Sequence, residues 1–408
     1  MRNNLILKNI RNINFTAFFA LIIYPSILIT LIVKYASTYQ LGFFELSLFL
    51  VGYYIANIAV GLGLHRLWSH GAYKTNKYVE FILAIFSAAT LQGPALSWAS
   101  NHFKHHTYTD TEKDPHTPLA YKNKLMGFLW SHMGWMMTGD GSYKSISKIT
   151  MVKLGRNKIL RWQLKYYWPI AISMNTIFPA LLGYIIGGSA VSAFAGFLFI
   201  GLGRALQQQA TFFVNSLCHF FGSQKYIKGT SRDVWWLFIL LLGENWHNFH
   251  HAFPSDYRNG VRWHQLDVHK WLIYLMSKCG LAWDLNITSQ LRIKAKIMQT
   301  SEQVSSIYIE RLEFMHKKVA ELGVICQQKF SELENSSIIC RKKIWTALAN
   351  YQYKLNNIKY QLYLQIKNYE NPSEKLILGI NNKISKIEAA LVKIYNENDL
   401  INSTKSLN

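Results

Sequence analysis

Acidic residues and cysteines are scarce in this chain of 408 residues. It carries 22 acidic and 44 basic side chains, and charged residues make up 16% of it, against about a quarter in an average soluble protein. The four cysteines, which show no CxxC pair or regular spacing, favour neither a disulfide framework nor a thiolate zinc site: Cys218, Cys279, Cys326 and Cys340. Because half of the residues are hydrophobic, we interpret the chain as a membrane protein.

Long uncharged runs predict four membrane-spanning helices. Residues 15–33 and 46–64 are each long enough to span. Residues 166–203 form a longer run, which Gly187, Gly188 and Ser189 divide into two helices joined by a tight turn. The first run follows a basic start, but it is too long for the apolar part of a signal peptide, so we interpret it as a retained membrane helix.

The net charge of +22 is also unevenly distributed. Lysine and arginine gather at the N-terminus, after the second run and before the third, whereas the turn around Gly187 has no charge. Positively charged loops stay in the cytoplasm, so both termini are predicted to be cytoplasmic. This pattern favours an anionic membrane surface as the partner of the basic residues, and not a nucleic acid.

Eight histidines form three short clusters. HRLWSH contains His65 and His70, HFKHH contains His102, His105 and His106, and HNFHH contains His247, His250 and His251. The spacing i, i+3, i+4 in the last two clusters places three rings on one face of a helix. The HRLWSH pair is a weaker signal, because five residues turn by about 140° around an α-helix. Neutral imidazole is the commonest metal ligand, so the clusters predict a site for two metal ions.

One apolar stretch, residues 81–99, decides whether the clusters can share metals. If it crossed the membrane, the first two clusters would lie on opposite sides. Gly93 and Pro94 within it favour a broken helix that does not span. All clusters then lie on the cytoplasmic side. The predicted fold is an all-α integral membrane protein with four transmembrane helices and a cytoplasmic helical cap that holds a histidine-rich di-iron site.

Together with longer motifs, the clusters resemble one enzyme family. HRLWSH, HFKHHTYTDTEKDPH, WSHMGW, NSLCHFFG and GENWHNFHHAFPSDYRNGVRWH resemble, in order and spacing, the membrane-bound fatty acyl-CoA desaturases of the delta-9 type. The resemblance covers residues 40 to 285 and implies nine histidine ligands for two irons. The ninth ligand would be His219, and Asn215 would contact an iron through water. His116, His132, His264 and His269 are interpreted as structural or supporting residues.

The resemblance implies oxygen-dependent removal of two hydrogens from a saturated acyl thioester, which gives a cis double bond, with delta-9 as the expected position. The cofactors would be two iron ions, with O2 as co-substrate. No HPGG haem motif of a fused cytochrome b5 occurs, so a separate ferredoxin or cytochrome b5 is the expected electron donor. Where animal members carry an Arg-Asp pair that contacts CoA, this chain has Ser100 and Asn101. Acyl-CoA is the first expectation as carrier, and acyl carrier protein or a lipid-linked chain stays open. The motif sequence is closer to bacterial members, so we expect a bacterial inner membrane.

Phe49, Tyr53 and Trp98 are predicted to line the substrate tunnel. Phe49 and Tyr53 lie one turn apart on the second membrane helix, where bulk would shorten the tunnel. We hypothesise a preference for palmitoyl-sized or shorter chains. The alternative is that both rings face lipid.

The resemblance divides the chain into a desaturase domain, residues 1–285, and a basic helical extension, residues 286–408. Recurring apolar residues in the extension predict amphipathic helices, as at Ile307, Leu312, Val319 and Leu322. A lipid hydroxylase or ketolase on the same histidine scaffold is the alternative function. A membrane metal transporter or sensor is a more distant one, since transport sites lie near the bilayer midplane.

Overall fold

The structure is a computed structural model that describes residues 13–138 and 146–300, with scattered positions after residue 300. It divides into two compact units, Met1–Ser289 and Gln290–Asn408. In the second unit, described positions such as residues 349–358 are helical. The predicted amphipathic positions Ile307, Leu312, Val319 and Leu322 lie outside the described residues. The first unit contains every predicted site residue.

Four helical segments are long and apolar enough to cross a membrane: Phe15–Ala36, Phe43–Ser69, Tyr167–Gly187 and Ala190–Phe220. The four predicted spans are thereby confirmed. The predicted turn between the last two is also present, because Gly188 adopts a left-handed conformation with φ of 70°. Ser189 then accepts a hydrogen bond from the backbone N–H of Ser192 and begins the next helix.

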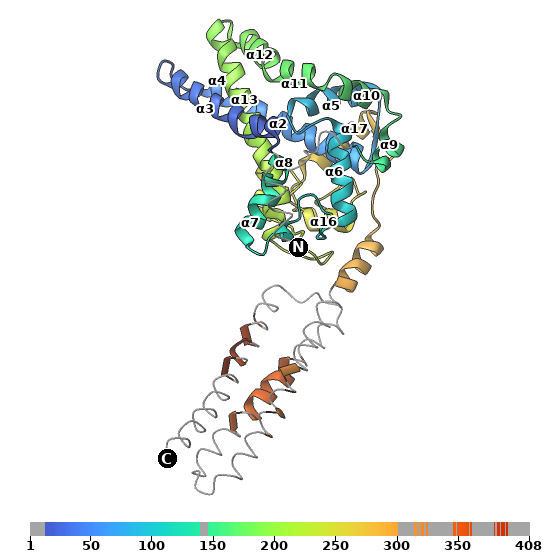
Figure 1. Ribbon diagram of the computed structural model, residues 1–408. Coiled ribbons are helices and arrows are strands. Elements are labelled where there is room, and N and C mark those ends of the chain that lie inside the picture. The colour runs from blue at the N-terminus through green and yellow to red at the C-terminus, as the bar shows by residue number, and fades with distance from the viewer. Residues whose placement is uncertain are drawn as a thin grey trace. The chain divides into compact units, whose positions relative to one another are not determined.

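Each span combines shorter elements (Figure 1). They are α2 (Phe15–Phe18), η1 (Phe19–Ile23), α3 (Tyr24–Ala36), α4 (Phe43–Ile58), η2 (Ala59–Ser69), α11 (Tyr167–Asn175), α12 (Ile177–Gly187), α13 (Ala190–Asn215) and α14 (Leu217–Phe220). Helix α13 packs against α3, α4 and α12. Glycine permits the closest approach: a Cβ atom at Gly52 of α4 would lie 2.2 Å from the backbone oxygen of Ile200 in α13. Such small residues let membrane helices pack backbone against backbone.

The ambiguous stretch 81–99 is divided between two helices. Helix α5 (Lys77–Ala89) begins at Asn76, whose side chain accepts two backbone N–H groups, and ends before Gly93. Gly93 has a φ of 97°, and Pro94 precedes α6 (Ala95–Tyr108). The prediction that Gly93 and Pro94 break this stretch is confirmed. Helix α6 therefore begins at the break and carries the second histidine cluster.

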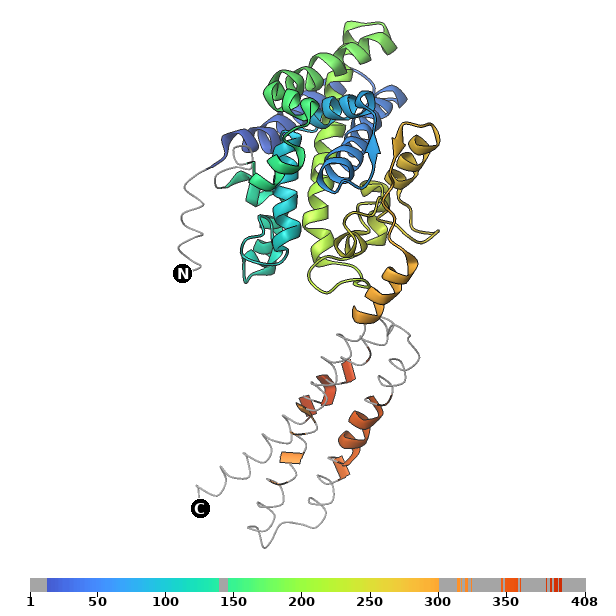
Figure 2. The same ribbon diagram turned by 90° about the vertical axis from the view of Figure 1, so that its right-hand side faces the viewer.

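Short elements form the remainder of the first unit around α6 and the end of α13 (Figure 2). They are η3 (Pro118–Ala120), α7 (Lys124–Leu129), η4 (Trp130–Gly134), α8 (Trp135–Met137), α9 (Lys148–Leu154), α10 (Lys158–Lys165), η5 (Trp235–Leu237), α15 (Phe238–Leu241), α16 (His247–Ala252) and α17 (Val268–Lys278). The strands β1 (Lys74–Thr75) and β2 (Ala282–Trp283) pair antiparallel, with Lys74 opposite Trp283. The predicted all-α fold with four membrane helices is confirmed.

Candidate metal centre

The first cluster lies on a π-helix. In η2 the backbone N–H of His70 bonds to the carbonyl of His65 at 3.1 Å, which is an i to i+5 hydrogen bond. This bond defines π-helical winding and brings residues five apart onto one side. The two rings consequently lie with centroids 4.9 Å apart. The α-helical expectation of about 140° between them does not apply here, because the helix is wound more widely.

The other two clusters each contribute to two histidine groups. On α6, His102 and His106 face one group, whereas His105 faces the other. On α16, His250 belongs to the first group and His247 and His251 to the second. A HxxHH motif is therefore not one ligand set. Its histidines are divided between two neighbouring groups. The first and last histidines, four residues apart, share one face of the helix, and the ring of the histidine between them is offset from that face.

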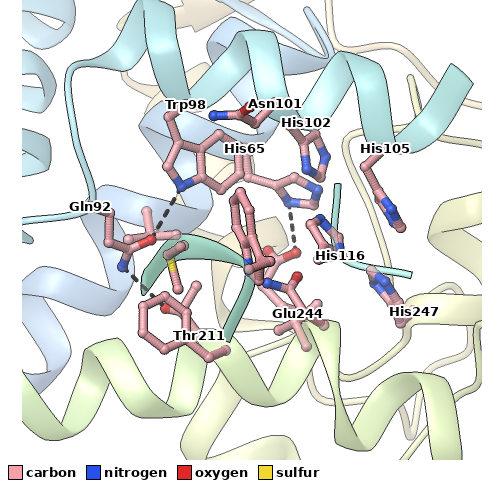
Figure 3. Close-up of a pocket in the computed structure, with 16 residues that line it drawn as sticks. His65, Gln92, Trp98, Asn101, His102, His105, His116, Thr211, Glu244 and His247 are labelled. Atoms are coloured by element: carbon pink, nitrogen blue, oxygen red, sulfur yellow. Dashed lines mark hydrogen bonds and ion pairs between the residues drawn. The ribbon is translucent and has the colours of Figure 1, made fainter. Parts of the chain in front are cut away.

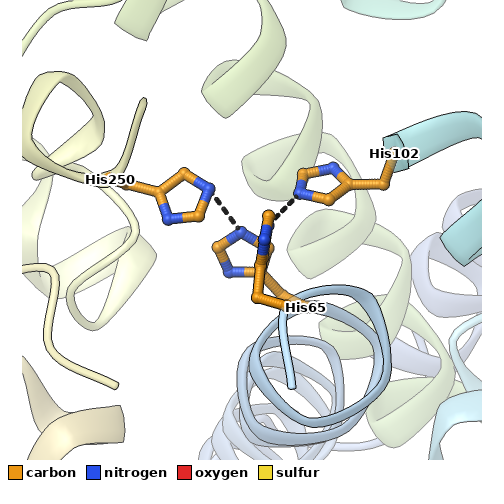
Figure 4. Close-up of side chains that lie close together, drawn as sticks. His65, His102 and His250 are labelled. Atoms are coloured by element: carbon orange, nitrogen blue, oxygen red, sulfur yellow. Dashed lines mark hydrogen bonds between the residues drawn. The ribbon is translucent and has the colours of Figure 1, made fainter. Parts of the chain in front are cut away.

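We call the first set the η2 group. His65, His70, His102 and His250 each place a ring nitrogen within 4.8 Å of the others. The Nε2 atoms of His65 and His250 are 3.0 Å apart, and those of His70 and His102 are 2.7 Å apart (Figure 4). His106 joins this group through its Nε2, which is 3.0 Å from that of His250.

We call the second set the α13 group, because it includes His219 at the end of the α13–α14 span. It consists of His105, His219, His247 and His251. The Nε2 of His247 is 3.0 Å from those of His219 and His251. The Nε2 of His105 is 3.3 Å from that of His251. The nine histidines expected as ligands thus gather in two adjoining groups.

Burial favours the neutral form of six of these imidazoles. Desolvation, followed by the neighbouring histidines, lowers the pKa values of His70, His102, His247, His250 and His251 well below the ordinary value of 6.5. The same causes lower the pKa of His106 to about 3. A neutral imidazole has a free lone pair for a metal. The groups are therefore electrostatically prepared to bind cations.

Two hydrogen-bond partners and one ion-paired carboxylate lie on the outer, Nδ1 side of three rings. His65 Nδ1 lies 2.7 Å from Glu244 Oε2, and His105 Nδ1 lies 2.9 Å from Asp114 Oδ1. His219 Nδ1 lies 2.7 Å from Thr230 Oγ1. When Nδ1–H donates outward, Nε2 is left as an acceptor. The Nε2 atoms of His65, His105 and His219 face those of His250, His251 and His247 at 3.0, 3.3 and 3.0 Å.

The proton direction at His219 follows from its surroundings. The hydroxyl of Thr230 donates to the carboxylate of Asp110, and the backbone N–H of Thr230 donates to the same carboxylate at 2.8 Å. The hydroxyl oxygen must then accept the Nδ1–H of His219. This fixes the Nε2 lone pair toward the α13 group.

The donor set fits two divalent transition metals. Imidazole nitrogens bind such ions at about 2.0–2.1 Å, so two adjacent ligands lie about 3 Å apart, as these Nε2 atoms do. The buried Nδ1 of His247 has no hydrogen-bond partner among the described residues. Asp114 also lies within 4.8 Å of ring nitrogens of His105 and His116, so one carboxylate adjoins the α13 group. Such a nitrogen-rich set suits iron, copper, nickel or zinc better than magnesium or calcium.

A buried ionic cluster supports Glu244. Arg66 donates to Glu244 Oε1 at 2.9 Å and to Asp267 Oδ1 at 2.9 Å. His269 Nδ1 lies 2.9 Å from the same Oε1 of Glu244. Although burial acts to raise it, the adjacent His65 and the charge of Arg66 hold the pKa of Glu244 well below its ordinary value. Glu244 is therefore an anion that links Arg66 to a member of the η2 group.

A pocket adjoins both groups on the side of α13. Asn215, His65 and His247 are among its lining residues, and Val60, Phe212 and Val214 are among its apolar walls. A polar bridge crosses it, because Trp98 Nε1 donates to Gln92 Oε1 at 3.2 Å and Gln92 Nε2 lies 3.5 Å from Thr211 Oγ1 (Figure 3).

The remaining predicted site residues lie in different surroundings. Trp98 lines the pocket and stacks on His102 at 4.8 Å. Tyr53 is buried in another cluster, and its hydroxyl donates to the carbonyl of Leu240 at 2.8 Å. Phe49 packs against the α3–α13 core. Their predicted role in substrate length stays a prediction.

The histidines interpreted as structural or supporting lie in different surroundings. His116 stacks on His105 with centroids 4.1 Å apart, and it also lines the pocket. His132 bonds through its two nitrogens to Ser216 and Gln209. His264 is exposed.

Comparison with known proteins agrees with these motifs. The family model described as fatty acid desaturase matches residues 43–276. The chain belongs to the fatty acid desaturase family.

Individual relatives of this desaturase-family chain come from fungi and plants. A probable acyl-CoA desaturase of Schizosaccharomyces pombe is 37% identical over 257 residues, which is 62% of this chain and 52% of that protein. Acyl-CoA desaturase 1 of Saccharomyces cerevisiae is 37% identical over 261 residues, 63% of this chain and 49% of that protein. Delta-9 acyl-lipid desaturase 2 of Arabidopsis thaliana is 32% identical over 244 residues, 58% of this chain and 73% of that protein. The chain spans about half the length of the two yeast relatives that it matches.

Sequence reasoning did not identify Glu244, Asp114, Thr230 and Arg66. Glu244 and Asp114 stand inside the quoted motifs GENWHNFHH and TEKDPH, so a search for carboxylates near histidine clusters would have found them. Arg66 stands between the histidines of HRLWSH. Thr230 offers no such signal, because its position follows only from the folded chain.

Proposed function

We propose that this protein is an oxygen-dependent fatty acyl desaturase that introduces a cis double bond into a saturated acyl chain. The observation that carries the proposal is the contact between two imidazole groups and one largely apolar pocket beside membrane helices. The relatives named as acyl-CoA and delta-9 acyl-lipid desaturases support this substrate class.

In the proposed reaction, one dioxygen and two electrons from a donor oxidise the acyl chain. Two hydrogens leave adjacent carbons, and with two further protons the oxygen becomes two water molecules. Two bound irons would supply the oxidant that an unactivated C–H bond requires. His65, His70, His102, His106 and His250 would hold one iron. The other would be held by His105, His219, His247 and His251, with Asn215 acting through water.

The chain's own residues would position the substrate. Val60, Phe212 and Val214 would surround the acyl chain and exclude water from the reacting carbons. The bridge of Trp98, Gln92 and Thr211 crosses the pocket beside His65 and His102, so an acyl chain must bend around it. We propose that this bend presents the carbons to be oxidised, and that the double bond forms at the delta-9 position.

Acyl-CoA is the proposed carrier, and a separate ferredoxin or cytochrome b5 is the proposed electron donor. At the positions discussed for CoA binding, Ser100 accepts the backbone N–H of Ser147 at 2.8 Å and Asn101 lines the pocket. The basic residues before α11, including Lys153 and Arg156, support a cytoplasmic site by the distribution rule for positive charge. Bacterial inner membrane remains the proposed location.

Expression in cells without their own desaturase tests the proposal. Fatty acids are then profiled by mass spectrometry, with the double bonds located. We expect a new cis-monounsaturated acid with the wild type, its absence with His106→Ala, and its retention with the control His264→Ala, which changes an exposed histidine. A hydroxylated or keto product would instead assign a hydroxylase or ketolase. Bound metal without any lipid product, in the presence of a working electron donor, would favour a transporter or sensor.

A further inference from the structure

A second pocket lies along the same helices as the first. On α4 and η2, Ala56 lines the second pocket and Val60, one turn later, lines the first. Likewise, Ala89 lines the second pocket and Gln92 lines the first. On α13, Arg204 lines the second pocket and Thr211, about 10 Å farther along the helix, lines the first. The two pockets therefore follow one another between the same three segments.

Two glutamines occupy the stretch of α13 between the pockets. Gln208 Nε2 donates to the carbonyl of Leu91 at 3.2 Å, and its Oε1 accepts from Arg204 Nη1 at 3.2 Å. Gln207 Nε2 donates to Thr211 Oγ1 at 2.7 Å. Both glutamines are almost fully buried. A hydrogen-bonded polar wall therefore lies on α13 between Arg204 of the second pocket and Thr211 of the first, although neither glutamine belongs to a pocket lining.

Arg204 makes this wall unusual. Its side chain is 3% exposed within a candidate membrane span, and its guanidinium faces the ring of Tyr24 at 5.3 Å. The Nε and Nη2 atoms have no hydrogen-bond partner in the part of the chain that the structure describes. A buried charge in a membrane helix is costly, and such residues mark functional positions.

We infer that Gln208, held between Leu91 and Arg204, closes the far end of the acyl pocket and sets the longest chain that fits. This inference rests on the proposed desaturase function. The methyl end of an acyl chain cannot form hydrogen bonds. An acyl chain that displaced Gln208 would therefore leave the amide of Gln208 and the guanidinium of Arg204 unpaired. The space beyond, lined by Ala56, Phe86 and Ala89, stays empty of substrate as long as the wall is intact.

The wall lies at a depth that suits an acyl chain. Gln208 is seven residues before Asn215, so it lies about 10 Å from it along the helix axis. An extended chain advances about 1.2 Å per bond, by analogy with the three bonds of an extended residue. Roughly eight bonds therefore fit between the reacting carbons and the wall. Removal of the wall adds the length of the second pocket.

The test compares products from a homologous series of saturated acids, from myristic to arachidic, fed to cells that express the wild type or Gln208→Ala. We expect the ratio of long to short unsaturated products to rise at least about tenfold with Gln208→Ala, since one methylene in a fitted pocket discriminates by that factor or more. Gln208→Ala combined with Ala56→Leu refills the space and should restore the wild-type profile. Leu206→Ala, on the exposed face of the same helix, should leave the profile unchanged.

Ala56→Leu alone tests the wall without weakening it. If wild-type chains stop at Gln208, this variant keeps the wild-type product lengths, and this result supports the inference even where Gln208→Ala fails to accumulate. Shorter products from Ala56→Leu would overturn it, because substrate would already occupy the second pocket. An active Gln208→Ala enzyme with an unchanged product profile would overturn the inference as well. If Tyr53→Ala shifted the product lengths instead, the limit on chain length would be assigned to Tyr53. The absence of unsaturated product from every variant and from the wild type would refute the desaturase function itself.

Discussion

The carboxylate of Asp114 lies 2.9 Å from Nδ1 of His105, and both side chains are almost fully buried. The same aspartate accepts the backbone N–H groups of Asp110 and His116. The turn that follows α6 is thus folded around Asp114. One residue both shapes this turn and orients a member of the α13 group.

Asp114→Asn is expected to weaken metal binding without unfolding the protein. The amide retains the shape of the carboxylate but cannot become the anion that favours Nδ1–H of His105. Loss of such an orienting partner lowers metal affinity by about 10–100-fold. Iron content per protein after dialysis against a chelator measures the effect, and Mössbauer spectra distinguish one lost iron from two. Glu112→Gln, an exposed carboxylate in the same turn, is the control. Equal iron retention in both variants would contradict the orienting role.

Arg66 is predicted to matter for stability. Its guanidinium contacts Glu244, Asp267 and the carbonyl of Tyr257 within the interior. Arg66→Leu leaves two buried carboxylates without their cation, which costs about 3–5 kcal/mol. We expect a lower unfolding temperature in detergent and less folded protein in the membrane. Arg66→Lys should recover only part of this stability, since an ammonium group cannot bridge both carboxylates bidentately. Arg262→Leu, which changes an exposed arginine, serves as the control. If Arg262→Leu and Arg66→Leu had the same unfolding temperature, this would argue against a stabilising role of the ionic cluster.

His106 and His116 flank the centre but have different predicted roles. His106 Nε2 is 3.0 Å from His250 Nε2, whereas His116 stacks on the ring of His105. His106→Ala should lower the iron content and abolish activity. His116→Phe should preserve the stacking and bind as much iron as the wild type. Metal analysis of the two purified variants checks this difference, and iron loss from His116→Phe would make His116 a ligand.

The sequence predicted the parts of the site better than their arrangement. Uncharged runs located the four spans, and Gly93 with Pro94 located the break before α6, because these signals are local. The pairing of His65 with His70 required the π-helical winding of η2, which residue spacing alone does not reveal. His219 came only from family resemblance.

The division of each HxxHH motif between two groups was beyond local reasoning. Helical spacing predicts which rings share a face, but His105 and His106 are assigned to groups by the positions of α16 and α13. A search near the clusters would have found the carboxylates Glu244 and Asp114, but their contacts with His65 and His105 exist only in the folded chain.

Trp98 provides the sharpest test of substrate positioning. Trp98→Phe keeps an aromatic ring beside His102 but removes the Nε1–H that holds Gln92 across the pocket. The acyl chain would then bend less reproducibly, and a misplacement of about 1 Å lowers turnover by about a hundredfold. We expect unchanged iron content, lower product yield and a mixture of double-bond positions, as measured by mass spectrometry. The control is Trp263→Phe, which changes a side chain that is 92% exposed. A single double-bond position at full yield in Trp98→Phe would mean that the walls of the pocket, and not this bridge, position the chain.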